Sequence, residues 1–144
     1  MKNDTTGSAG TSQLLFADAA VEVLEEQKTL PAKFGRMLKR LKLKEKVEGK
    51  SVAVKMHLGD NIGFTTIHPL FVRILVQAVW DAGAKSVKII DDKVASNDPN
   101  VGLARGYTSE VLGCPVMSCF GQGRGYYYNV DIGYKGLDTA QISG

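Results

Sequence analysis

Apolar residues at every second position from Val52 to Leu58 predict a β-strand, because side chains alternate between the two faces of a strand. Lys55 and His57 fall at intervening positions and therefore share the other face of this strand. In a parallel sheet covered by helices on both faces, apolar residues would be expected there as well. The two polar residues indicate either a functional position or an edge strand with an exposed second face, and the pattern leaves both readings open.

An almost wholly apolar segment over 69–82 predicts a helix that is buried on most sides. Pro69 suits the first helical position, which makes His68 the expected N-cap, and Gly83 suits the C-terminal cap. The run SVKIID at 86–91 predicts a second strand, and a right-handed crossover would make it parallel to the first. Strand, loop, helix and strand together predict one βαβ unit.

Weaker patterns predict the remaining elements, and residues 1–11 have the composition of a flexible leader outside the fold. Amphipathic periodicity predicts a helix from Leu30 to Leu41 with Pro31 in its first turn. The other expected elements are strands at 13–17, 115–120 and 126–132, a helix over 101–112 broken near Gly106, and a connection over 136–144. We therefore expect residues 12–144 to form a single α/β domain. Its mostly parallel, Rossmann-like sheet should have about four or five strands, with helices on both faces.

Composition narrows the class of protein but does not name a function. Hydrophobic residues make up 44% and charged residues 23% of the 144 residues, as in ordinary globular domains. A net charge of +3 and the lack of any apolar run of ~18–20 residues favour neither a nucleic acid nor a membrane partner. Two cysteines make no disulfide framework, and the start of the chain lacks the apolar core of a secretory signal. A reducing, cytoplasmic location is expected.

The polar loop 59–66 joins the first strand to the buried helix, at the edge where open α/β sheets bind ligands. Glycines there would admit a ligand close to the backbone, and free N–H groups at a helix start favour an anion. The candidate ligand-binding residues are Gly59, Gly63, Thr65, Thr66, His68 and Asp91. An ordinary βα connection closed by threonine hydrogen bonds is the alternative. The glycine spacing matches neither a dinucleotide-binding nor a Walker A motif.

Other chemistry-bearing residues are sparse. His57 and His68 could ligate a metal with Asp60 or Asp91, but a strand histidine and a helix-capping histidine explain them more simply, and no metal site is assigned. Cys114 and Cys119 form at most half of a metal site, and packing is the simpler interpretation. Arg105 and Arg124 lie in expected loops, where an arginine either binds an anion or faces water.

Several separated motifs, in order along the chain, resemble the DUF362 family. They are VAVKMHLG at 52–59, then Gly63, Thr65, Pro69, Val72-Arg73, Ala82-Gly83 and Asp91, and finally RGYTSEVLGCPV at 105–116. The resemblance is collinear from about residue 13 to the end of the chain. The family departs from this sequence near residues 119–121, where an acidic residue is common.

The resemblance implies a relation to uncharacterised iron–sulfur centre proteins, which often carry cysteine clusters in an insertion or a C-terminal region. This chain would then be the N-terminal part of a larger protein with an iron–sulfur domain encoded downstream, or a stand-alone truncated relative. Independently of the resemblance, the apolar helix 69–82 makes a second copy of the chain the other candidate partner. No residue here matches the iron–sulfur ligands, so no cofactor is assigned.

Two hypotheses about function follow. In the first, the chain is a ligand-binding module of a redox-associated protein and holds a small anionic ligand or cofactor at loop 59–66. Lys55 would supply fixed positive charge and His57 could move a proton, which makes them the candidate catalytic residues. In the second, the chain is a non-catalytic assembly domain that packs through helix 69–82 against a partner. The sequence leaves open whether the protein is an enzyme.

Overall fold

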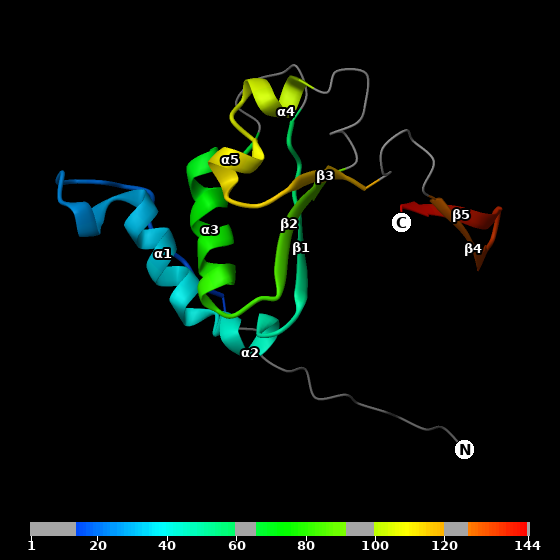
Figure 1. The fold of residues 1–144 in the computed structure, drawn as a ribbon, viewed down its shortest axis with the longest axis horizontal. Helices are drawn as coiled ribbons and strands as arrows, with labels where there is room; N and C mark the ends of the chain where they lie inside the picture. The colour runs from blue at the N-terminus through cyan, green and yellow to red at the C-terminus, as the bar shows by residue number, and fades with distance from the viewer. Residues whose placement is uncertain (1–13, 60–65, 92–99, 120–126, 144) are drawn as a thin grey trace.

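The centre of the computed structural model is a βαβ unit, and the structure describes residues 14–59, 66–91, 100–119 and 127–143. The unit consists of β1 (Ser51–Lys55), α3 (Pro69–Asp81) and β2 (Ser86–Asp91), as Figure 1 shows. β1 and β2 are parallel, with Ser51 opposite Ser86 and Lys55 opposite Ile90. The predicted strand–helix–strand unit is therefore confirmed, although the first strand ends at Lys55 rather than near Leu58.

A third strand completes the parallel sheet. β3 (Val116–Ser118) pairs with β2, so the strand order is β1-β2-β3 and β1 is an edge strand. The backbone N–H of Cys119 extends this pairing by donating to the carbonyl of Asp91 at 3.0 Å. The strand expected at 115–120 is thus present in shortened form.

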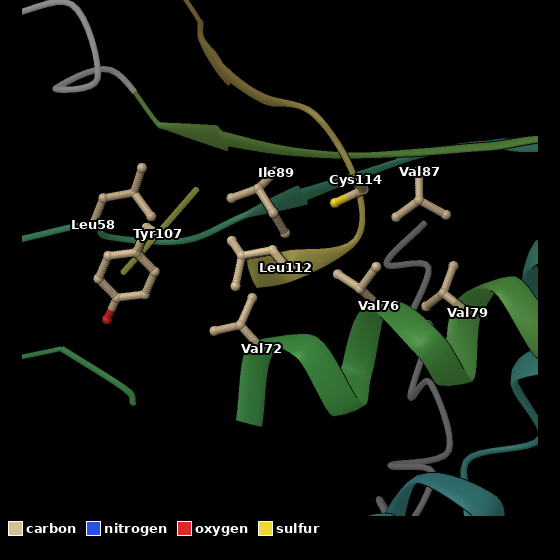
Figure 2. Close-up of a cluster of buried hydrophobic side chains, with 9 residues drawn as sticks. All are labelled: Leu58, Val72, Val76, Val79, Val87, Ile89, Tyr107, Leu112 and Cys114. Carbon is tan, nitrogen blue, oxygen red and sulfur yellow. The ribbon is translucent and has the colours of Figure 1, made fainter. Parts of the chain in front are cut away.

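The core lies between the sheet and the helices on one of its faces, α3 and α5 (Ser109–Leu112). Every third or fourth residue of α3 points at the sheet, as an amphipathic helix requires. Ile89 of β2 is fully buried opposite this face. The nine buried apolar residues drawn in Figure 2 are Leu58, Val72, Val76, Val79, Val87, Ile89, Tyr107, Leu112 and Cys114.

A further helix covers the other side of α3. α1 (Leu30–Arg40) begins with Thr29 as its N-cap and Pro31 in its first turn, as expected from the sequence. The rings of Phe34 and Phe71 meet edge to face with their centroids 5.6 Å apart. The 3₁₀ helix Glu26–Lys28 precedes α1, and α2 (Leu43–Val47) follows it. Because α3 lies between the sheet and α1, its nearly all-apolar composition is explained within this chain.

The expectation of helices on both faces of a sheet of four or five strands is not confirmed among the described residues. The parallel sheet there has three strands, and its second face carries no helix in Figure 1. Ala53, Lys55 and Lys88 on that face are exposed, and Ile90 is partly buried. Small and charged residues alternate with apolar ones along β1 and β2, which suits a sheet with one solvated face rather than a doubly covered one.

The strand expected at 13–17 is also absent, since residues 14–17 have no regular structure. Leu14 is 87% and Phe16 86% exposed. An apolar run favours a strand only where a neighbouring strand can accept its backbone hydrogen bonds. The segment that follows is tied to α1 instead, because Lys33 Nζ donates to the carbonyls of Asp18 and Ala20 at 2.8 and 2.5 Å.

An antiparallel hairpin forms the end of the described chain. β4 (Tyr127–Tyr134) confirms the strand expected at 126–132, and it pairs with β5 (Leu137–Ser143). The interpretation of 136–144 as a connection is therefore wrong, because most of it is a strand. Gly136 has a φ of 88°, which lets the chain turn sharply between the two strands. Figure 1 shows the hairpin standing apart from the parallel sheet.

The helical region expected at 101–112 is broken as the sequence indicated. It consists of α4 (Asn100–Ala104) and α5, and Gly106 between them has a φ of 83°. All described helices are short, and the longest, α3, has 13 residues. Within the described ranges, no helix combines the length and the apolar character needed to cross a bilayer.

The two cysteines should react with alkylating agents at very different rates. Cys114 is buried in the core, and desolvation raises the pKa of its thiol, although a backbone hydrogen bond involving Ile89 lowers it in part. Because the thiolate is the reactive form, Cys114 should be alkylated at least about tenfold more slowly than the less buried Cys119 in native protein at pH 8. Mass spectrometry of iodoacetamide-treated protein measures both rates. Equal native rates would contradict this packing, whereas in denaturant the difference should vanish.

Candidate functional site

A fully buried carboxylate lies at the end of β2. Asp91 has no exposed surface, and a buried charge must be paired or hydrogen-bonded to be tolerated. Lys55 Nζ lies 2.7 Å from its Oδ1, and the backbone N–H of Leu58 donates to its Oδ2 at 2.8 Å. His57 Nδ1 is 4.0 Å from Oδ2. The structure therefore brings together Lys55, His57 and Asp91, all of which the sequence had singled out.

This cluster fixes the chain where it leaves β1. Met56 still donates to the carbonyl of Ile90 at 3.2 Å, and the bond from Leu58 to Asp91 then holds the next turn of backbone against the sheet. The side chains of Lys55 and His57 are 57% and 55% exposed. The edge-strand interpretation is confirmed among the described residues, because β1 lies at the edge of the sheet and has an exposed face. Lys55 also pairs with a buried acid, and a functional role for Lys55 and His57 stays a prediction.

The Arg105 guanidinium lies directly against Gly59. A Cβ added at Gly59 would be 1.8 Å from Arg105 Nη1, so only glycine leaves room for this arrangement. Gly59 also has a φ of 95°, which other residues rarely adopt. Arg105 Nη1 is buried, yet it has no hydrogen-bond partner within the part of the chain that the structure describes. A cationic donor is therefore held, unsatisfied, beside the backbone at the end of β1.

The turn after α4 positions this arginine. The backbone N–H groups of Arg105 and Tyr107 both donate to the carbonyl of Gly102, at 3.2 and 3.0 Å. Tyr107 is 2% exposed; its hydroxyl donates to the carbonyl of Ile67 and lies 2.8 Å from Thr66 Oγ1. In Figure 2 this hydroxyl points away from the aliphatic cluster. Tyr107 thus ties the Arg105 turn to the chain that enters α3.

The start of α3 offers few donors to a ligand. His68 is the N-cap, as expected, and its Nδ1 accepts from the N–H of Leu70 at 3.2 Å. Pro69 has no N–H, and the N–H of Phe71 donates to the carbonyl of His68 at 3.0 Å. Because these first-turn groups are already engaged, the buried donor that lacks a partner among the described residues comes from Arg105 rather than from the helix.

The candidate ligand-binding residues are only partly described. Gly59, Thr66 and Asp91 lie at the carboxyl edge of the sheet, and His68 caps α3. Gly63 and Thr65 lie outside the described residues, as do Asp60 and Arg124. Within the described ranges, no three His, Cys, Asp or Glu side chains are grouped so that they could hold a metal ion. Cys114 packs in the core, which is the interpretation that the sequence favoured over half of a metal site.

Sequence reasoning weighed Arg105 only as a loop arginine and did not single out Tyr107. One signal was available, since the glycine that breaks the helical region at 106 separates these two residues. Their closeness to Gly59 and Thr66 depends on the return of the chain from β2 and could not be read from local pattern.

These features define the chain as an α/β protein whose polar side chains gather at the carboxyl edge of a parallel sheet, where such folds bind ligands. The chain belongs to the DUF362 family, because the model of that family, described as a domain of unknown function, matches residues 52–144. The match covers β1 with its following loop, the Arg105 turn and the terminal hairpin. No curated protein and no solved structure matches the chain.

Replacing Asp91 should destabilise the fold. Asp91→Ala removes the acceptor of the buried Leu58 N–H and the partner of Lys55, and the expected loss is about 2–3 kcal/mol in the free energy of unfolding. Asp91→Asn keeps an acceptor for Leu58 and should lose less. Urea unfolding measures both, with Lys88→Ala on the exposed face as the control, expected to change by no more than about 0.5 kcal/mol. If Asp91→Ala changes the free energy of unfolding no more than the control does, the contacts of Asp91 do not stabilise the fold.

The space beside Gly59 can be tested against a second glycine. Gly49 also has a positive φ, 70°, but a Cβ there would meet nothing within 4 Å. Gly59→Ala should therefore cost about 1–3 kcal/mol more than Gly49→Ala, because it adds a clash with Arg105 to the same backbone strain. Thermal or urea unfolding gives the difference, and Arg105→Ala in the Gly59→Ala background should recover part of it. Equal losses of stability at the two glycines would show that Arg105 does not lie against Gly59.

Proposed function

We propose that this DUF362 domain binds a small oxyanion, the carboxylate or phosphate group of a ligand, at the carboxyl edge of β1 and β2. The observation that carries the proposal is the buried Arg105 Nη1, which has no hydrogen-bond partner among the described residues. An unsatisfied buried donor costs free energy, and more when it is charged. An oxyanion is the natural partner of a guanidinium, because charge-assisted and often paired hydrogen bonds join them.

The surroundings of Arg105 support an anion more than a cation. Among the described residues the buried carboxylate is that of Asp91, and it is paired with Lys55 and with the Leu58 N–H. Gly59 is buried, and its missing side chain lets the guanidinium lie directly against the backbone. The low-dielectric surroundings of a buried atom strengthen its attraction to a counter-charge.

Lys55 and His57 are the candidate catalytic residues at this edge. His57 lies 4.0 Å from the carboxylate of Asp91 and is half-exposed, which suits an imidazole that is oriented by an acid and exchanges protons with a ligand or solvent. The link to a redox protein rests on the family resemblance alone. The assembly hypothesis gains no specific observation, because the sheet and α1 contact most of the apolar residues of α3 within this chain.

Anion titrations test the proposal. Phosphate, sulfate and acetate, added at low ionic strength to the full chain, should raise its melting temperature or give a calorimetric binding signal. Arg105→Gln should weaken binding at least about tenfold, because it removes the charged donor. Arg40→Gln, on the exposed end of α1, is the matched control and should bind like the parent protein.

The stability of the free protein separates a ligand-binding arginine from a structural one. Because Arg105 Nη1 has no partner within the described ranges, Arg105→Gln should leave the anion-free protein as stable as before, or slightly more stable. Loss of stability without anion, or anion binding that survives Arg105→Gln, would each contradict the proposal. So would the absence of any binding by the parent protein.

A further inference from the structure

A second cavity lies away from the sheet edge, between α1, α2 and the C-terminal half of α3. Its volume is about 500 Å³, within the ~300–1,000 Å³ range of small-molecule pockets. Figure 1 shows these three helices meeting at the end of α3 that is far from the Arg105 turn. The apolar side chains that line it include Leu38, Leu43, Ile74 and Ala78. We refer to it as the α1–α3 groove.

A glycine inside a helix keeps this groove open. Gly35 lies in the middle of α1 and lines the groove, although glycine is a poor helix former. A Cβ at Gly35 would meet nothing within 4 Å, so no neighbouring atom requires glycine at this position. Ala78 and Ala82 on α3 are small residues that line the same space. Glycine at position 35 therefore lowers the stability of α1 without relieving a clash, and it lies where the groove is open.

The rim of the groove is positively charged. Lys39, Lys42 and Lys44 line it, with Asp81 as its acidic residue. Asp81 accepts a hydrogen bond from Gln77 at 2.9 Å. Lys42 and Lys44 make exposed ion pairs of 3.6 and 3.4 Å with Glu45 and Glu48, which are weak and easily exchanged. Lys39 makes no ion pair with any residue that the structure describes.

The backbone at the rim is strained. Lys42 has a φ of 51° and is left-handed, a conformation that costs energy for any residue except glycine. Such strain is often found at ligand clamps, where the surrounding structure holds it. Lys42 separates α1 from α2, and its conformation sets how α2 turns back beside the groove.

From these features we infer that the α1–α3 groove binds a free alkyl carboxylate of medium chain length. Its methylene chain would lie along Leu38, Ile74 and Ala78, where burial of apolar surface favours it. Its carboxylate would pair with Lys39 and Lys42 at the rim. The inference is independent of the oxyanion site, because the two sites share no residue.

Chain length and head-group charge test the inference in the parent protein. Isothermal titration with hexanoate, octanoate and decanoate, kept below their micelle concentrations, should show affinity rising by about fourfold per added methylene until the groove is full. Decyltrimethylammonium has a comparable chain and the opposite charge, and should bind at least about tenfold more weakly than decanoate. Equal binding of the two amphiphiles would overturn the inference, as would binding only to anionic vesicles or only to an acidic amphipathic peptide.

Variants of Gly35 separate loss of the groove from loss of the fold. Gly35→Leu places a side chain in open space and replaces a poor helix former, so the protein should be at least as stable as the parent. It should bind decanoate at least about tenfold more weakly, because the groove is filled.

Lys39→Gln should weaken the binding of decanoate but not the binding of decyltrimethylammonium. Lys88→Gln on the sheet serves as its matched control. Arg105→Gln should leave decanoate binding unchanged. Undiminished binding to Gly35→Leu would overturn the inference.

Discussion

The buried carboxylate of Asp91 is the interaction on which the rest of the site depends. Its burial at the end of β2 requires compensation, and Lys55 and the Leu58 N–H provide it from the neighbouring strand. These two interactions hold the chain after β1 against β2, beyond the last residue of β1. They thereby fix Gly59 at a defined place beside the sheet, and the Arg105 guanidinium can lie against it only because that place is fixed.

The parts of the fold that local pattern decides were predictable from the sequence. The two-residue period of β1, Pro69 at the start of α3 and the apolar run of β2 point to one βαβ unit, and the structure contains it. The failures concern pairing. The sequence predicted a strand at 13–17 and a connection at 136–144, yet of the described parts of these two segments only the second pairs with a strand, because Gly136 turns the chain back on itself. Backbone partners are a tertiary property, and a strand without one does not form.

Half of the candidate site could be predicted from the sequence, because it depends on local strand pattern and on parallel topology. Lys55 and His57 break the apolar rule on one strand, and Asp91 ends the next strand at the same edge, so parallel topology alone brings them close. Arg105 and Tyr107 come from a turn that lies beyond β2 in the chain, and local sequence pattern does not indicate that this turn contacts the same edge. A loop arginine usually faces water, and its burial against Gly59 is visible only in three dimensions.

The two proposed sites differ because the two sides of α3 are packed differently. Toward the sheet, Val72, Val76 and Val79 are almost fully buried, and Arg105 lies beside Gly59 beyond the end of β1. Toward α1, the Phe34–Phe71 contact is close at one end, whereas Gly35 and the alanines of α3 leave the other end open. A helix held on two sides can thus be rigid at its start and border a cavity at its end. Ligands at the two ends would therefore stabilise different contacts of the same helix, one with the sheet edge and one with α1, without competing for any residue.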